Sequence, residues 1–265
     1  MLAIVRDERV NSSKKAINDM TADHNLTLLP LLLFKADAPF DIDLIYAQLG
    51  HDDNHFGALY HPEAQLLMHE RLLPVVLLAA RLLQGRNGWR LKVNDCFRPV
   101  EAQAKMAEFG LPPQLVMRPG TGGHPRGMAV DVEAVNTEGD LIPMGTPFDF
   151  FTHDLSQNPA ARSWTDFGPP VMSAQIVANR QALDAAMFDA AAACGEQLIG
   201  YSEEWWDFRF PAAVSNEYPA FSDRDLPAAL RMMEKPEQAD ASLMQIWAEK
   251  RLQIRSKLHD LAAIA

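Results

Sequence analysis

The sequence predicts an α+β fold: one domain with a central antiparallel sheet flanked by helices, plus an N-terminal extension and a C-terminal helix. Three observations support this. Helical and strand patterns are mixed without regular βαβ alternation, no internal repeat or low-complexity tract is present, and 265 residues with 48% hydrophobic content are enough for a buried core. We expect an extension over residues 1–40, a catalytic body over 41–222 and a helical extension over 223–265.

The first elements fall around a long apolar region. Residues 26–34 form an apolar run that Pro30 divides, so helix and strand are both possible there. Over residues 62–84 apolar positions recur at helical spacing, with a proline near the start and glycines after the end, which predicts a helix. We expect Pro74 to kink or interrupt it.

A strand, a tight junction and a helix come next. Residues 91–97 have the composition of a short strand, which the dipeptide at 98–99, Arg-Pro, should end. Residues 100–109 return to helical spacing, and Gly110 is the expected stop.

The second half alternates between loops and regular elements. Residues 117–123 and 143–149 are rich in glycine and proline and predict loops. Residues 128–135 alternate in a valine-rich, strand-like pattern, and 198–210 return to strand composition. Between them, the alanine-rich stretch 174–194 predicts a long helix that a glycine closes.

The chain ends in a predicted amphipathic helix that begins at about Glu237. Its apolar positions form one stripe: Leu243, Trp247, Ile254, Leu258 and Leu261. Either the body of the protein or a second subunit could cover this stripe, so a homo-oligomer is possible.

Composition excludes several classes of partner. The net charge of −11 argues against binding to phosphate backbones or anionic lipid, because both depend on clustered Lys and Arg. We therefore expect no nucleic acid and no membrane partner. The most apolar segment, 72–83, is shorter than the roughly 20 residues of a membrane span. Residues 1–15 lack the pattern of a secretory signal, and Cys96 and Cys194 form no disulfide framework, so we expect a cytoplasmic protein with reduced thiols.

Two residue types typical of metal sites bracket a transition from loop to strand. His124 follows two glycines, and Asp131 lies seven residues later in the predicted strand. An imidazole and a carboxylate in this arrangement can converge on a divalent ion. The spacing alone is a weak signal, because a histidine in a glycine-rich loop is more often simply solvated.

Four motifs in order strengthen that interpretation. Residues 123–131, Gly-His-Pro-Arg-Gly-Met-Ala-Val-Asp, resemble the His-x-x-Gly-x-Ala-x-Asp signature of the zinc D-alanyl-D-alanine dipeptidases of the vancomycin-resistance type. Three more segments are similar to further motifs of that family. They are residues 95–99, Asp-Cys-Phe-Arg-Pro; residues 143–149, Pro-Met-Gly-Thr-Pro-Phe-Asp; and residues 202–207, Ser-Glu-Glu-Trp-Trp-Asp. The resemblance covers about residues 41–210.

The resemblance implies a role for each matching residue. His124 and Asp131 would be metal ligands, and Glu204 would be the general base toward a metal-activated water. Arg98 would lie beside the scissile carbonyl, and Asp149 would hold the free amino end of the substrate. Without the resemblance, Arg98 could equally form a surface ion pair, and Asp149 could form a turn or cap a helix.

The chain departs from the family pattern at two positions. Asp207 stands where the family has its third metal ligand, a His, and Gly122 stands where it usually has a Ser. Three outcomes are open: Asp207 ligates, another group such as His153 or Glu203 replaces it, or the site binds metal poorly. A set of one imidazole and two carboxylates would shift the preference of the site from zinc toward harder cations such as manganese or magnesium.

These residues predict a metal-dependent dipeptidase. The substrate would be D-alanyl-D-alanine or a similar small dipeptide, and the cofactor would be one divalent metal, zinc first and manganese or another harder ion next. Two alternatives are a catalytically silent relative that binds a peptide or partner in the same cleft, and a related hydrolase that cuts a different peptidoglycan amide bond, because fold and motif do not determine substrate.

Overall fold

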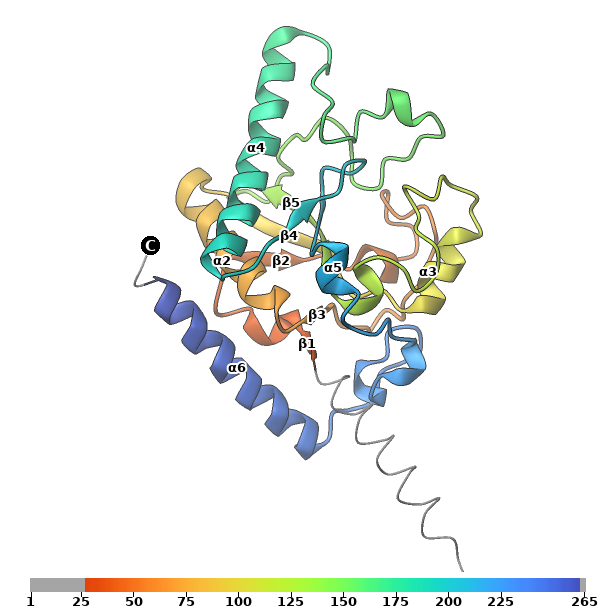
Figure 1. Cartoon of the computed structure of the whole chain (residues 1–265), viewed down its shortest axis with the longest axis vertical. Coiled ribbons are helices and arrows are strands. Elements are labelled where there is room, and N and C mark those ends of the chain that lie inside the picture. The colour runs from red at the N-terminus through yellow and green to blue at the C-terminus, as the bar shows by residue number, and fades with distance from the viewer. Residues whose placement is uncertain (1–26, 263–265) are drawn as a thin grey trace, which may run out of the picture.

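A five-stranded mixed sheet forms the centre of the computed structural model, which describes residues 27–262 (Figure 1). The strands follow the order β2-β4-β5-β7-β6. Their bounds are Phe40–Ile42 for β2, Arg90–Asp95 for β4, Ala129–Val135 for β5, Asp207–Arg209 for β7 and Ile199–Gly200 for β6. The predicted α+β class is confirmed, and the strands expected over 91–97 and 128–135 are β4 and β5.

The expectation of a fully antiparallel sheet is wrong at one edge. β2 pairs with β4 in parallel, whereas the other three strand pairs are antiparallel. A parallel pair requires a long crossover between its strands. Here the crossover contains a short strand and the long helix α2, Leu72–Asn87. The sequence pattern did not indicate that these elements connect two parallel strands.

The apolar run around Pro30 contains both kinds of structure. Strand β1, Leu28–Pro30, pairs with β3, Leu67–His69, and the run continues as a 3₁₀ helix, Leu31–Phe34. Pro30 has no amide hydrogen to continue a ladder, which suits the last position of the strand.

The helix expected over 62–84 begins later than predicted. Helix α2 spans Leu72–Asn87, and β3 takes the start of the predicted helix. Pro74 lies in the first turn of α2, where an amide hydrogen would have no partner within the helix, so it interrupts nothing. The expectation that Pro74 interrupts the helix is therefore wrong. Gly88 ends α2 in the left-handed conformation with φ 72°.

Within residues 27–262, four further α-helices follow: α3, Val100–Ala107; α4, Pro170–Ala193; α5, Ala212–Ser215; and α6, Ala241–Ala262. Helix α2 packs against both α4 and α6. In Figure 1, α6 runs diagonally along the outside of the body, on the side opposite α3. Leu243, Ile254 and Leu258 of the predicted stripe are buried, so the body covers that part of the stripe. None of the helices within residues 27–262 has the length and apolar character needed to cross a membrane.

The segment 198–210 is a strand only at its two ends. β6 and β7 pair with each other, and the chain between them, residues 201–206, turns back over the end of the sheet. Short 3₁₀ helices occupy several other connections: Ile45–Ala47, His124–Arg126, Leu155–Gln157, Asp223–Asp225 and Ala228–Leu230.

Candidate active site

Three aspartates form a row across the three central strands of the sheet, at the end of β4 and the start of β7. Asp131 on β5 is paired in register with Asp95 on β4 and with Asp207 on β7. We call these three residues the carboxylate row. All three are buried. An irregularity between Val93 and Asp95 shifts the register of β4, and such bulges commonly redirect a side chain next to an active site.

His124 lies beside this row in a tight turn. Its 3₁₀ helix ends at Gly127, which has φ 63°. A side chain at Gly123 would approach the Cβ of Ala129 to 2.8 Å, so the turn can lie this close to β5 only with glycine there. The Nδ1 of His124 lies 2.7 Å from the carbonyl oxygen of Cys96, which suits donation from Nδ1 and leaves the lone pair of Nε2 free.

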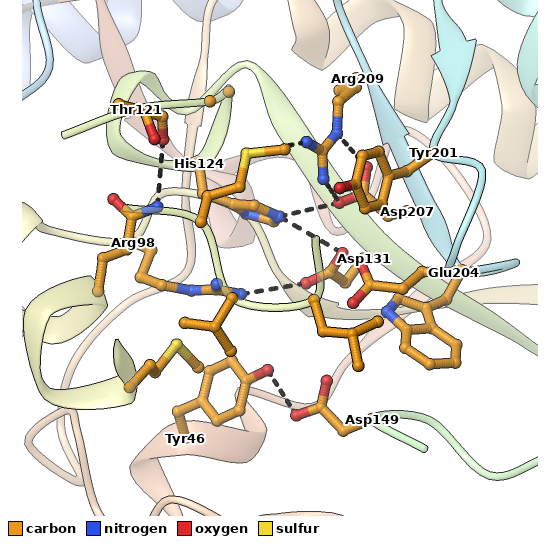
Figure 2. A pocket seen from close by; sticks show the side chains of 18 of the residues that line it. Tyr46, Arg98, Thr121, His124, Asp131, Asp149, Tyr201, Glu204, Asp207 and Arg209 are labelled. Carbon is orange, nitrogen blue, oxygen red and sulfur yellow. Dashed lines mark hydrogen bonds and ion pairs between the residues drawn. The ribbon is translucent and has the colours of Figure 1, made fainter. Parts of the chain in front are cut away.

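The free nitrogen of His124 faces two of the three carboxylates (Figure 2). Nε2 lies 3.5 Å from Asp131 Oδ1 and 3.3 Å from Asp207 Oδ2. A tetrahedral ion with bonds of about 2.0–2.1 Å would hold its donors about 3.3–3.4 Å apart. Asp131 Oδ1 is buried and has no hydrogen-bond partner within residues 27–262. The distances from His124 Nε2 and the unsatisfied oxygen of Asp131 therefore both fit a divalent cation held by His124 and Asp131, with Asp207 Oδ2 at a similar distance from the imidazole nitrogen.

Asp95 is the nearest further carboxylate. Asp95, His124 and Asp131 each place one possible ligand atom within 4.8 Å of the others. Tyr60 donates to Asp95 Oδ1 at 3.0 Å and Arg98 donates to its Oδ2 at 2.9 Å, just as Arg209 donates to both oxygens of Asp207. Asp95 therefore orients Arg98, and Asp95 and Asp207 are alternative third carboxylates beside His124 and Asp131.

The charges of these groups depend strongly on one another. Burial alone lowers the pKa of His124, but the carboxylates of Asp131 and Asp207 outweigh it and raise the pKa to about 10. Burial alone raises the pKa of Asp207, but the guanidinium of Arg209 and the ring of His124 hold it well below its usual range. Without a metal, the positive charges of His124 and Arg209 therefore balance the buried carboxylates. A bound cation can supply the same positive charge.

Arg98 lies at the opposite end of the carboxylate row from Arg209 (Figure 2). It follows β4 and precedes α3, because the Pro99 next to it cannot extend the strand. Its Nη2 donates to Asp131 Oδ2 at 3.4 Å, and its guanidinium lies over the ring of Tyr46 at 5.2 Å. Arg98 thus holds one oxygen of Asp131, while the other oxygen faces His124.

Glu204 lies in the turn between β6 and β7, and its carboxylate points into the cleft beside Asp131 (Figure 2). Burial raises its pKa well above the usual value, and Asp207 and Asp131 raise it further. The turn is anchored by two buried indoles. Trp205 donates from Nε1 to Thr146 Oγ1 at 2.9 Å, and Trp206 packs edge-to-face on Phe148.

Asp149 closes another side of the cleft. It has φ 53°, an uncommon conformation that aspartate tolerates better than most residues. Tyr46 donates its hydroxyl to Asp149 Oδ2 at 2.6 Å. Burial nevertheless raises the pKa of Asp149 well above its usual value, although the Tyr46 hydrogen bond opposes this. The result is a buried carboxylate suited to a positively charged group.

The cleft thus brings together all six residues that the sequence predicted for the site: Arg98, His124, Asp131, Asp149, Glu204 and Asp207. The two suggested substitutes for the third ligand, His153 and Glu203, do not line it. Gly122 lines the cleft with φ 80°, and a side chain there would meet Met117 Sδ at 2.5 Å. A serine at this position would require that methionine to move.

The sequence analysis assigned no role to three residues in or beside the cleft. Asp95 begins the motif that contains Arg98, and Tyr46 lies in the segment 43–47 at the start of the resemblance; Tyr46 and Arg209 line the cleft. Arg209 follows Asp207 by two residues in a strand-like segment, and this spacing places both side chains on one face of the strand. That spacing was the signal available for Arg209.

Comparison with known proteins agrees with the geometry. Residues 28–224 match the model of peptidase family M15, described as D-ala-D-ala dipeptidase. The chain is also 30% identical over 185 residues to the D-alanyl-D-alanine dipeptidase of Escherichia coli (strain K12). That alignment covers 69% of this chain and 84% of the bacterial protein.

Proposed function

The chain belongs to the D-Ala-D-Ala dipeptidase family of M15 peptidases, and from this we propose that it hydrolyses D-alanyl-D-alanine or a similar small dipeptide with one divalent cation. The observation that carries the proposal is the convergence of His124, Asp131 and Asp207 beside Glu204 in one buried cleft.

We assign the cation to three atoms: His124 Nε2, Asp131 Oδ1 and Asp207 Oδ2. Zinc is the first choice because imidazole and carboxylate donors at this spacing suit it, and manganese is the second because two of the three donors are hard oxygens. When bound, such an ion polarises the scissile carbonyl and makes the attacking water more acidic.

Glu204 and Arg98 would carry the protein's own part of the chemistry. We propose that Glu204 accepts a proton from the attacking water and passes it to the leaving amine, because its carboxylate points into the cleft beside Asp131 (Figure 2) and a raised pKa makes a carboxylate a better proton acceptor. Arg98 would stabilise the negative charge that develops on the carbonyl oxygen. It also holds Asp131 Oδ2, which leaves Oδ1 available.

The position of Asp149 favours a substrate with a free amino terminus. Asp149 lines the same cleft as His124, Asp131 and Glu204. Asp149 and Tyr46 form a buried acidic end, which would bind the ammonium group of a free amino terminus. We propose that a substrate held there directs its first peptide bond toward Glu204, which lines the same cleft.

The test is an alanine-release assay with added zinc or manganese. The protein should release alanine from D-Ala-D-Ala, and a panel of dipeptides of mixed chirality would establish whether it prefers D,D substrates or cuts another amide. Release no greater than that of a Glu204→Ala variant would refute hydrolysis.

A metal-poor relative that only binds a peptide is the second candidate. Arg209 favours it, because this arginine already donates to both oxygens of Asp207 and supplies a positive charge without a metal. Calorimetry distinguishes the two: binding of dipeptide without binding of zinc or manganese would support the second candidate, and one tightly held ion per chain would exclude it.

A further inference from the structure

Arg209 and Asp207 form a buried ion pair at the edge of the proposed cation site. They lie two residues apart on β7, so their side chains share one face of the strand. Arg209 Nε donates to Asp207 Oδ1 at 2.7 Å, and Arg209 Nη2 donates to Asp207 Oδ2. The residues are 8% and 0% exposed, so solvent screens this pair very little.

The guanidinium is also held from its other side. Its carbon lies 4.0 Å from the centre of the Tyr201 ring, and Nη1 lies 3.4 Å from Met117 Sδ. Contacts on an aromatic face favour a planar, delocalised cation. Arg209 is thus fixed in place, and its charge remains beside the site.

The pair changes the charge of the ligand set. Asp207 Oδ2, one of the oxygens that Arg209 contacts, also lies 3.3 Å from His124 Nε2. A carboxylate contributes a formal charge of −1 where an imidazole contributes none, and the guanidinium contributes +1. Asp207 and Arg209 together are therefore neutral, as a histidine at this position would be, and Asp131 supplies the remaining negative charge.

We propose that Asp207 and Arg209 act together as one net-neutral ligand unit. Arg209 is a positioning residue in it: it offsets the charge of the carboxylate and keeps Oδ2 directed at His124. This inference rests on the proposed function, and it means that Asp in place of His at position 207 preserves the charge of the cation site.

The first test removes the arginine charge and measures metal affinity. Arg209→Met has a similar length and no charge, so it exposes a cation in the site to the full negative charge of Asp207. We expect zinc and manganese, titrated in competition with a chromophoric chelator, to bind on the order of tenfold more tightly or better. Arg209→Lys, which keeps the charge, should stay within about threefold of the unchanged protein.

The second test exchanges the ligand with and without the arginine. Asp207→His alone leaves Arg209 as an unpaired cation beside a neutral imidazole. The double variant Asp207→His with Arg209→Met has neither charge, and it should bind zinc on the order of tenfold more tightly than the single His variant. If Arg209→Met alone does not fold, this second comparison tests the same inference.

The outcomes separate this inference from hydrolysis itself. Equal zinc affinities with and without Arg209, in both backgrounds, would overturn the inference even if alanine is released. The predicted affinity changes without alanine release would support the inference and reject the proposed hydrolysis. No metal binding in any variant would overturn both.

Discussion

Loss of the Asp207 carboxylate should destabilise the metal-free protein strongly. Asp207→Asn keeps the shape of the side chain but removes the charge that Arg209 faces. Two charge-assisted hydrogen bonds change, and breaking a buried ion pair typically costs about 3–5 kcal/mol because one charge remains unpaired. The variant also relieves repulsion with Asp131 and Glu204, so we expect the lower end, about 3 kcal/mol.

The measurement is denaturant unfolding after chelation, so that metal binding adds nothing to the free energy of unfolding. For a domain of this size the melting temperature should fall by about 6–12 °C. Asp189→Asn is the matched control. Asp189 accepts from Arg86 at 2.7 Å, but their side chains are 56% and 45% exposed, so the control should lose no more than about 1 kcal/mol.

Two results would refute this reasoning. A loss below about 1 kcal/mol for Asp207→Asn would mean that the pair contributes no more than an exposed one. A loss equal to that of Asp189→Asn would mean the same, whatever its absolute size.

Three further predictions concern catalysis, substrate binding and pH. Glu204→Gln should lower alanine release about 100- to 10,000-fold without changing zinc occupancy, whereas Glu203→Gln outside the cleft should retain activity. Tyr46→Phe removes a hydrogen bond that lowers the pKa of Asp149, so more of this carboxyl is neutral at pH 7; KM should rise, and the rise should shrink at higher pH. Burial, and to a lesser extent nearby cations, lower the pKa of His69 to about 3, so unfolding takes up a proton between about pH 6.5 and 3. The free energy of unfolding should therefore fall as the pH falls through this range, by up to about 1.4 kcal/mol per pH unit. Urea titrations at several pH values should find a weaker dependence of this free energy on pH for His69→Gln.

The sequence predicted those elements whose patterns are local. β5 combines valine-rich alternation with a preceding glycine loop, and α4 has a long alanine-rich periodicity with a glycine stop, so both were found with errors only at their ends. The apolar stretch before Leu72 was assigned to the helix because a fully buried strand and a buried helix have the same composition. Its pairing with β1 is a contact across about 40 residues of chain, which periodicity cannot indicate.

The site was predicted as a set of residues but not as an electrostatic arrangement. His124, Asp131 and Glu204 were identifiable because they lie in ordered motifs. The pairing of Asp207 with Arg209 depends on β7 being a strand at that point, and β7 contains only three residues. The register that aligns Asp95 with Asp131 depends on an irregularity in β4 that no local pattern marks.

The carboxylate row has a consequence for how such a site can change over evolutionary time. Its three carboxylates are placed by the ladder of hydrogen bonds between β4, β5 and β7, and not by a loop. A single inserted or deleted residue within β5 would turn the following side chains to the opposite face and separate Asp131 from both neighbours. A substitution changes only one side chain and leaves the others in place. We therefore expect proteins that share this sheet to tolerate exchange of single residues in the row better than changes in the lengths of these strands.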